Sequence, residues 1–136
     1  LKCRVMTTIN KFEDIIGWQK ARVLCKLINT HTQKELFAKD FKLVNQIKSS
    51  SGSAMDNIAE GFERAGNKEF IQFLFVAKGS ASETRSQLYR ALDNEYITNE
   101  EFQVSYNLAD EVGKLIRGFI SHLKTSKLKG DKYKNK

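Results

Sequence analysis

The stretch TNEEFQVSYNLADEVGKLIRGFISHL, residues 98–123, decides what kind of fold this chain can adopt. Its apolar residues recur at steps of three and four, which places them on one face of a helix: Phe102, Tyr106, Ala109, Val112, Ile116, Phe119, Ile120 and Leu123. Thr98 and Glu101 have the spacing of a capping box, which begins such a helix. We therefore predict an amphipathic helix over residues 98–124.

Three more segments have the same periodicity and predict helices over residues 13–30, 39–64 and 68–94. Phe41 and Val44 are expected on the apolar face of the second, and Asn67 is expected to cap the third. Proline is absent, so long helices are permitted throughout. Without a convincing strand pattern, the chain is predicted to be all-α, an antiparallel up-down-up-down four-helix bundle over residues 12–124 that assembles into a homo-oligomeric ring.

Two runs of small residues test the helix assignments. Residues 49–53 read SSSGS, which on its own is typical of a flexible linker, and residues 79–82 read GSAS. If the turn at 65–67 makes the two helices antiparallel, position 53 faces 79 and position 50 faces 82. The two small runs then coincide, which favours a close helix crossing over a linker.

The positive charge of the chain is concentrated at its ends. The 136 residues have a formal net charge of +7, yet the segment between Met6 and Leu123 holds equal numbers of basic and acidic residues. We expect residues 1–11 to form a partly flexible extension and 125–136 a Lys-rich flexible tail. The tail's lysines are predicted to contact nucleic-acid phosphates: Lys124, Lys127, Lys129, Lys132, Lys134 and Lys136.

Two basic pairs on the predicted helices are further candidates for phosphate contact. Arg22 and Lys26 are four residues apart, and Lys78 and Arg85 are seven apart, so each pair shares a helix face. Ordinary solvated side chains would give the same pattern, and that alternative stays open.

Catalytic and metal-binding patterns are not found in the sequence. Neither His31 nor His122 has the Glu three residues earlier that a di-iron bundle needs, and each is expected at the surface or rim. Cys3 and Cys25 are too few for a disulfide framework or a four-cysteine zinc site, and Cys25 is expected to be a small core residue. We expect a non-enzymatic cytoplasmic protein without metal, cofactor or membrane span.

The segment from Phe70 to Ala77 is apolar nearly all round, apart from Gln72, and is therefore too hydrophobic for a helix that buries one stripe. One explanation is an oligomer interface formed by Phe70, Phe73, Phe75 and Val76. The alternative is that the loop at 33–42, with Leu36 and Phe37, covers this surface.

The motif NIAEG at residues 57–61 carries a family resemblance when it is combined with Arg64, Phe70, Gly79, Ser80 and Glu83. The chain resembles the bacterial four-helix-bundle family whose founding members are encoded in intervening sequences of 23S ribosomal RNA genes. The resemblance implies ring-shaped homopentamers. A related branch, the accessory variability protein of diversity-generating retroelements, binds a reverse transcriptase and nucleic acid. Met55 and Ser49 depart from the family pattern, and Ser49 weakens the case for a basic stripe on the second helix.

Within the motif, Asn57, Glu60 and Arg64 share one helix face, and Glu60 is spaced to form an ion pair with Arg64. The favoured interpretation is structural: these polar groups fix the register between helices, as do Gly61, Gly79, Ser80 and Glu83. A functional site built on Asn57, Glu60, Arg64 and Glu83 is the minor alternative.

These features predict a non-enzymatic homopentameric bundle that acts as a nucleic-acid-associated scaffold. Five tails on one ring would carry a charge of about +25, so weak contacts would add up. The alternative is a protein-interaction adaptor, for example for a reverse transcriptase, with no direct role in binding nucleic acid.

Overall fold

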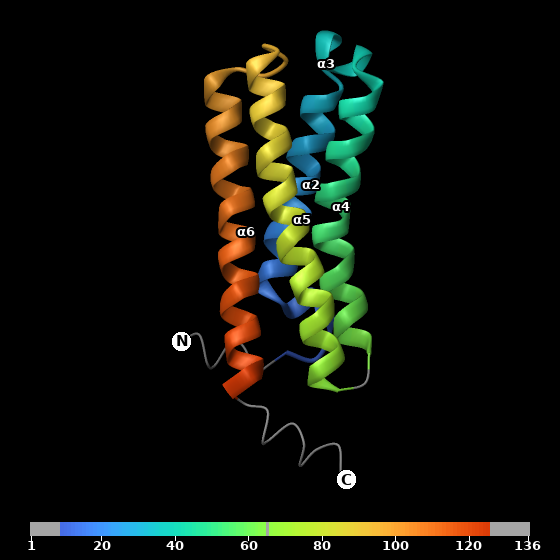
Figure 1. Cartoon of the computed structure of the whole chain (residues 1–136), viewed down its shortest axis with the longest axis vertical. Coiled ribbons are helices and arrows are strands. Elements are labelled where there is room, and N and C mark those ends of the chain that lie inside the picture. The colour runs from blue at the N-terminus through green and yellow to red at the C-terminus, as the bar shows by residue number, and fades with distance from the viewer. Residues whose placement is uncertain (1–8, 65, 126–136) are drawn as a thin grey trace.

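The computed structural model describes residues 9–64 and 66–125, and it shows an all-helical bundle (Figure 1). No strand occurs in this described part of the chain. Its elements are a short 3-10 helix η1 (Phe12–Asp14) and the helices α2 (Ile16–Thr32), α3 (Glu35–Lys39), α4 (Phe41–Glu63), α5 (Asn67–Asp93) and α6 (Asn99–Thr125). The all-α prediction is confirmed, with α3 and η1 as short additions.

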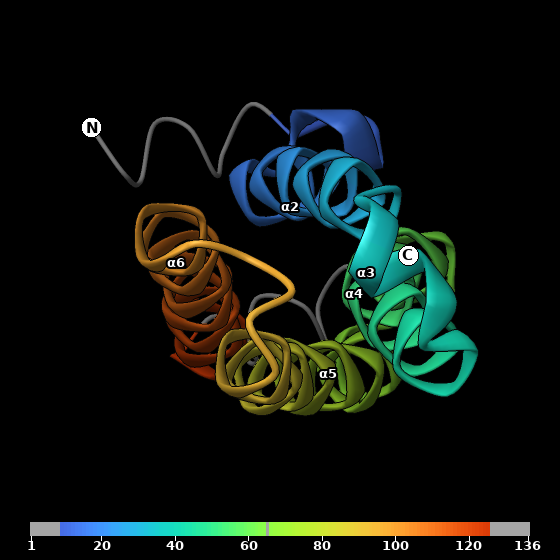
Figure 2. The same cartoon turned by 90° about the horizontal axis from the view of Figure 1, so that it is seen from above.

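The four long helices run alternately up and down, and Figure 2 shows them in the order α2, α4, α5, α6 around the bundle axis. Each long helix contacts its two neighbours in this order, and α4 lies diagonally opposite α6. Most of the predicted N-terminal extension (1–11) and of the predicted Lys-rich tail (125–136) lies outside the described residues, namely 1–8 and 126–136, as does Ala65. No helix among the described residues combines the length and apolarity needed to cross a membrane.

Two apolar clusters form the core along the bundle. One includes Ile58, Leu74 and Ile116, and the other includes Leu24, Leu43 and Leu88, all of them fully buried. Burying one such side chain stabilises the fold by roughly 1.5–3 kcal/mol, so these residues supply the main driving force for bundle formation.

Between these clusters, α4 and α5 meet through small hydroxyl side chains. Ser50 Oγ lies 2.8 Å from Thr84 Oγ1, and Ser80 Oγ donates to Ser53 Oγ at 2.8 Å. All of residues 49–53 are helical, so the predicted close crossing is confirmed and the linker alternative is wrong. The observed partners differ by one or two positions from the predicted ones, and Gly79 is exposed rather than at the crossing.

Of the two helix caps predicted from the sequence, one is confirmed and one is wrong, and the structure adds a third cap at Asp40. The capping box is confirmed, because Glu101 N donates to Thr98 Oγ1 and Thr98 N donates to Glu101 Oε1. Asp40 caps α4 by accepting a hydrogen bond from Leu43 N at 3.1 Å. Asn67 is not the cap of α5, however. Gly66 precedes the helix with φ 91°, a left-handed conformation that glycine adopts without steric cost.

Phe41 is the other correction to the predicted core. Its side chain is 75% exposed, although the apolar spacing placed it on the buried face of α4. Phe37 from α3 is buried at this end of the bundle instead, with its ring stacked on Tyr96 at 5.1 Å. A five-residue helix has no periodicity to reveal it, so the sequence could not show which phenylalanine fills the core.

Candidate nucleic-acid interface

A groove between α5 and α6 gathers basic side chains from both helices. Its volume is about 220 Å³. We call it the basic groove and define it by its lining residues: Lys78, Ser82, Arg85, Asp110, Gly113, Lys114 and Arg117. Four basic side chains therefore surround a single carboxylate, which concentrates positive charge here although the segment from Met6 to Leu123 as a whole holds equal numbers of basic and acidic residues.

Small residues keep this groove open. Ser82 is exposed on α5, and a Cβ placed on Gly113 of α6 would meet no atom within 4 Å. The antiparallel packing of α5 and α6 then sets Lys78 and Arg85 opposite Lys114 and Arg117. The basic residues thus flank a depression that an extended anionic chain can enter.

Asp110 lies among these cations and is ion-paired with two of them. Its Oδ2 is 3.0 Å from Lys114 Nζ, and its Oδ1 is 3.4 Å from Arg85 Nη1. The hydrogen bond from Lys114 lowers the pKa of Asp110, and the positive charges of Lys114, Arg85 and Arg117 act in the same direction. This carboxylate is therefore ionised at neutral pH and partly neutralises the groove.

The other two basic residues of the groove are free to bind an anion. Within residues 9–64 and 66–125, neither Lys78 nor Arg117 forms a hydrogen bond or an ion pair. Basic groups without an ion pair in the protein contribute most to the free energy of phosphate binding, because they exchange only solvent and counterions for the phosphate.

Aromatic rings lie next to one end of the groove. Arg85 is placed over the ring of Tyr106, 5.6 Å from its centroid, and its Nη1 donates to the Tyr106 hydroxyl at 3.3 Å. Tyr106 is grouped with Tyr89 and Phe102, and we call these three residues the aromatic cluster. Farther along α6, Lys124 Nζ lies 5.3 Å from the ring centroid of Phe75.

The structure brings together only some of the basic residues predicted from the sequence. Lys78 and Arg85 lie in the groove, while Arg22 and Lys26 are exposed on α2 and do not line it. Lys124 is exposed near the end of α6, and the other tail lysines lie outside the described residues. Lys114 and Arg117 were missed by the sequence analysis. They could have been found by pairing the positions of the antiparallel helices α5 and α6, in the way that positions of α4 and α5 were paired in the sequence.

The polar residues of the NIAEG motif contact neighbours within and just after α4, and through Ser53 they connect to α5. Asn57 Nδ2 donates to the carbonyl oxygen and to Oγ of Ser53, each at 2.9 Å, and Ser53 Oγ in turn accepts from Ser80. Arg64 Nη2 pairs with Glu60 Oε2 at 2.7 Å on the surface. In the described part of the chain, no hydrogen bond joins Glu83 to Asn57, Glu60 or Arg64, so the four residues do not meet as one polar constellation.

The four residues predicted for an oligomer interface have different environments. Phe70 is buried inside the bundle, with its ring 5.4 Å from that of Phe119, and Phe73 is partly buried. Phe75 and Val76 are 48% and 53% exposed. The loop alternative is wrong, because α3 packs at the opposite end of the bundle from the start of α5 (Figure 1).

His31 was expected at the surface or rim, and this expectation is wrong. It is buried between α2 and α6, where its Nε2 lies 2.7 Å from Ser105 Oγ. Burial lowers the pKa of His31, with the charge of Glu101 acting in the opposite direction, so the imidazole is neutral at pH 7. Cys25 is partly buried and donates to the Ser51 carbonyl, and burial raises its pKa, which keeps the thiol protonated.

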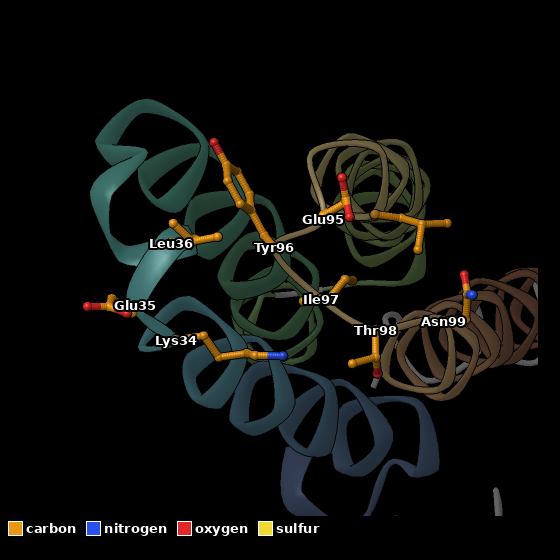
Figure 3. Close-up of a pocket in the computed structure, with 9 residues that line it drawn as sticks. Lys34, Glu35, Leu36, Glu95, Tyr96, Ile97, Thr98 and Asn99 are labelled. Carbon is orange, nitrogen blue, oxygen red and sulfur yellow. The ribbon is translucent and has the colours of Figure 1, made fainter.

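A second hollow, of about 560 Å³, lies at the end of the bundle where α3 packs (Figure 3). Lys34 reaches across it toward Thr98, but its amino group already pairs with Glu101. Glu35 and Glu95 also line the hollow, so it has no excess of positive charge. No group of three or more metal-ligating side chains occurs among the described residues. The basic groove is therefore the better candidate for anion binding.

The fold places this protein in the class of antiparallel helical bundles. The chain belongs to the 23S rRNA-intervening sequence protein family, whose model matches residues 13–118. The resemblance seen in the sequence is thereby confirmed.

The structure is also similar to a crystal structure of a protein with unknown function from the S23 ribosomal protein family of Bacteroides thetaiotaomicron VPI-5482. The two share 27% sequence identity with a TM-score of 0.71, over 77% of this chain and 98% of that chain. A comparison with curated proteins gave no match.

Proposed function

We propose that this protein is a non-enzymatic, homo-oligomeric helical bundle of the cytoplasm that binds the phosphate backbone of RNA or DNA. The observation that carries the proposal is the basic groove, in which Lys78 and Arg117 form no hydrogen bond or ion pair within the described chain and Lys114 and Arg85 share one carboxylate. Phosphodiesters present one negative charge per nucleotide, which matches a line of cations better than a single small anion does.

The groove also has the extended shape that a nucleic-acid backbone needs. Lys78 and Arg85 are two helical turns apart on α5, or about 10 Å along its axis. Arg117 and Lys124 continue the series along α6 toward the Lys-rich segment that follows Thr125 in the sequence. A backbone bound in the groove would therefore meet successive basic side chains and not one isolated charge.

Self-association through α5 is the second part of the proposal. Phe75 and Val76 are adjacent apolar residues, each about half exposed, and exposed apolar surface of this kind is typical of protein interfaces. The family resemblance implies five subunits, and each added subunit would bring another basic groove. Multivalent contacts would then raise the avidity for one nucleic-acid strand.

Changing Phe75 to glutamate is expected to dissociate the oligomer, because it replaces an apolar contact surface with a charged group, and burying that group is costly even beside Lys124. Phe41→Glu is the matched control, since Phe41 is an even more exposed phenylalanine on α4 at the opposite end of the bundle. Light scattering measures both masses. A monomeric mass for the unmodified protein would refute self-association, and dissociation by Phe41→Glu would place the contact on another face.

Asp110→Asn is expected to strengthen nucleic-acid binding about two- to tenfold at low salt, because it removes the only anion in the groove. Glu111→Gln changes the net charge equally at the next position. That carboxylate faces Lys20 of α2 at 3.8 Å, so little effect is expected. Fluorescence anisotropy with a labelled oligonucleotide measures both affinities.

The same titration tests the proposed function as a whole. If the unmodified chain fails to bind RNA or DNA at about 50 mM salt, the nucleic-acid role is wrong and the adaptor alternative takes its place. Equal gains from Asp110→Asn and Glu111→Gln would show that only net charge matters and that the groove is not the binding site.

A further inference from the structure

The aromatic cluster continues the basic groove along α5. Lys78, Ser82, Arg85 and Tyr89 follow one another at steps of four, three and four residues, so they form a single stripe on the helix. Lys78 and Tyr89 are about 16 Å apart along the helix axis. An extended strand that contacts Lys78 and Arg85 would therefore reach the ring of Tyr89 at the next turn.

The Tyr89 ring is accessible and supported from behind. Its side chain is 49% exposed, whereas Phe102 is buried and Tyr106 is partly buried. The Tyr89 ring centroid lies 4.9 Å from that of Phe102 and 5.5 Å from that of Tyr106. Packing against two rings limits the rotation of Tyr89, so little conformational entropy is lost when a flat ligand stacks on its open side.

The charges around this ring also suit a nucleic-acid ligand. The neighbouring Tyr106 raises the pKa of Tyr89, so its phenol is neutral at physiological pH and does not repel phosphate. One turn beyond Tyr89 the helix ends at Asp93, and Glu95 and Glu100 follow, all of them exposed carboxylates. A polyanion is repelled there, which makes Tyr89 the last contact on this side of the groove.

We propose that the groove binds single-stranded nucleic acid, with phosphates on its basic side chains and one unpaired base stacked on Tyr89. This inference rests on the proposed function and names the ligand class of the same site. Every base has an aromatic face, so stacking of this kind requires no particular nucleotide sequence. In a duplex those faces are covered by neighbouring base pairs, and only the backbone contacts remain.

The test compares a labelled single strand of RNA with a duplex of the same sequence, using the full chain. Tyr89→Leu removes the aromatic face but keeps an apolar side chain over Phe102, and Tyr89→Phe keeps the ring without its hydroxyl. Tyr89→Leu is expected to weaken single-strand binding about tenfold and to leave duplex binding unchanged. Tyr89→Phe is expected to bind both ligands like the unmodified protein.

Thermal melting of each variant shows whether it is folded, and Tyr89→Gln is a second ring-free variant if Tyr89→Leu melts early. The stacking proposal is overturned if neither ring-free variant loses single-strand affinity, or if both lose duplex affinity to the same extent. In those two cases the groove still binds phosphate and the proposed function stands. If the unmodified chain binds neither ligand, the proposed function fails together with this inference.

Discussion

Gly61→Ala is expected to lower the free energy of unfolding by about 1–3 kcal/mol, although alanine is intrinsically the better helix former. A Cβ on Gly61 would lie 2.6 Å from Phe73 Cβ and 2.9 Å from Phe70 Cδ1. Phe73 Cβ is attached directly to the backbone of α5, so no change of rotamer moves it away. The helices α4 and α5 would have to separate at the point where Phe70 enters the core.

Gly79→Ala is the matched control for this prediction. A Cβ on Gly79 meets no atom within 4 Å, and the residue lies in the interior of α5. The substitution is therefore expected to stabilise the protein by about 0.5–1 kcal/mol. Urea denaturation followed by circular dichroism measures both variants. If Gly61→Ala were as stable as Gly79→Ala, the two helices could not approach as closely as the structure shows.

The long helices could be predicted from the sequence because their apolar periodicity is strong and no proline interrupts it. It also indicated the α4–α5 crossing to within one or two residues, since small side chains on both helices leave few other registers. It could not identify α3 or choose between Phe37 and Phe41 for the core. Both are phenylalanines four positions apart in the sequence, and only the packing of the short helix α3 distinguishes them.

The candidate site was harder to predict because it depends on contacts between distant residues. Lys78 and Arg85 share a helix face, which the sequence shows, but Lys114 and Arg117 join them only through the register of α5 and α6. The burial of His31 has the same origin, because its partner Ser105 is 74 residues away. The charge pattern of one helix predicts which of its side chains are exposed to solvent. A binding groove between two helices also depends on how those helices pack.

Removing two basic residues of the groove is expected to weaken nucleic-acid binding about ten- to a hundredfold at low salt. The variant combines Lys114→Gln with Arg117→Gln, which removes the positive charge from the α6 side of the groove and keeps polar side chains of similar helix propensity. Each lost phosphate contact also leaves one more counterion on the nucleic acid, so the salt dependence of binding changes together with the affinity.

The control combines Lys42→Gln with Lys48→Gln. Both lysines are exposed on α4, which lies diagonally opposite α6 in the bundle (Figure 2). The net charge of the chain changes equally in the two variants, so a difference between them reports where the nucleic acid binds.

The most direct test of phosphate binding in the basic groove is the slope of log K against log salt concentration for a single strand. For the unmodified protein and the control the slopes are expected to agree. For the Lys114→Gln, Arg117→Gln variant the slope is expected to be shallower by about 1.4, which corresponds to two lost phosphate contacts. Equal slopes for the groove variant and the unmodified protein would contradict the account.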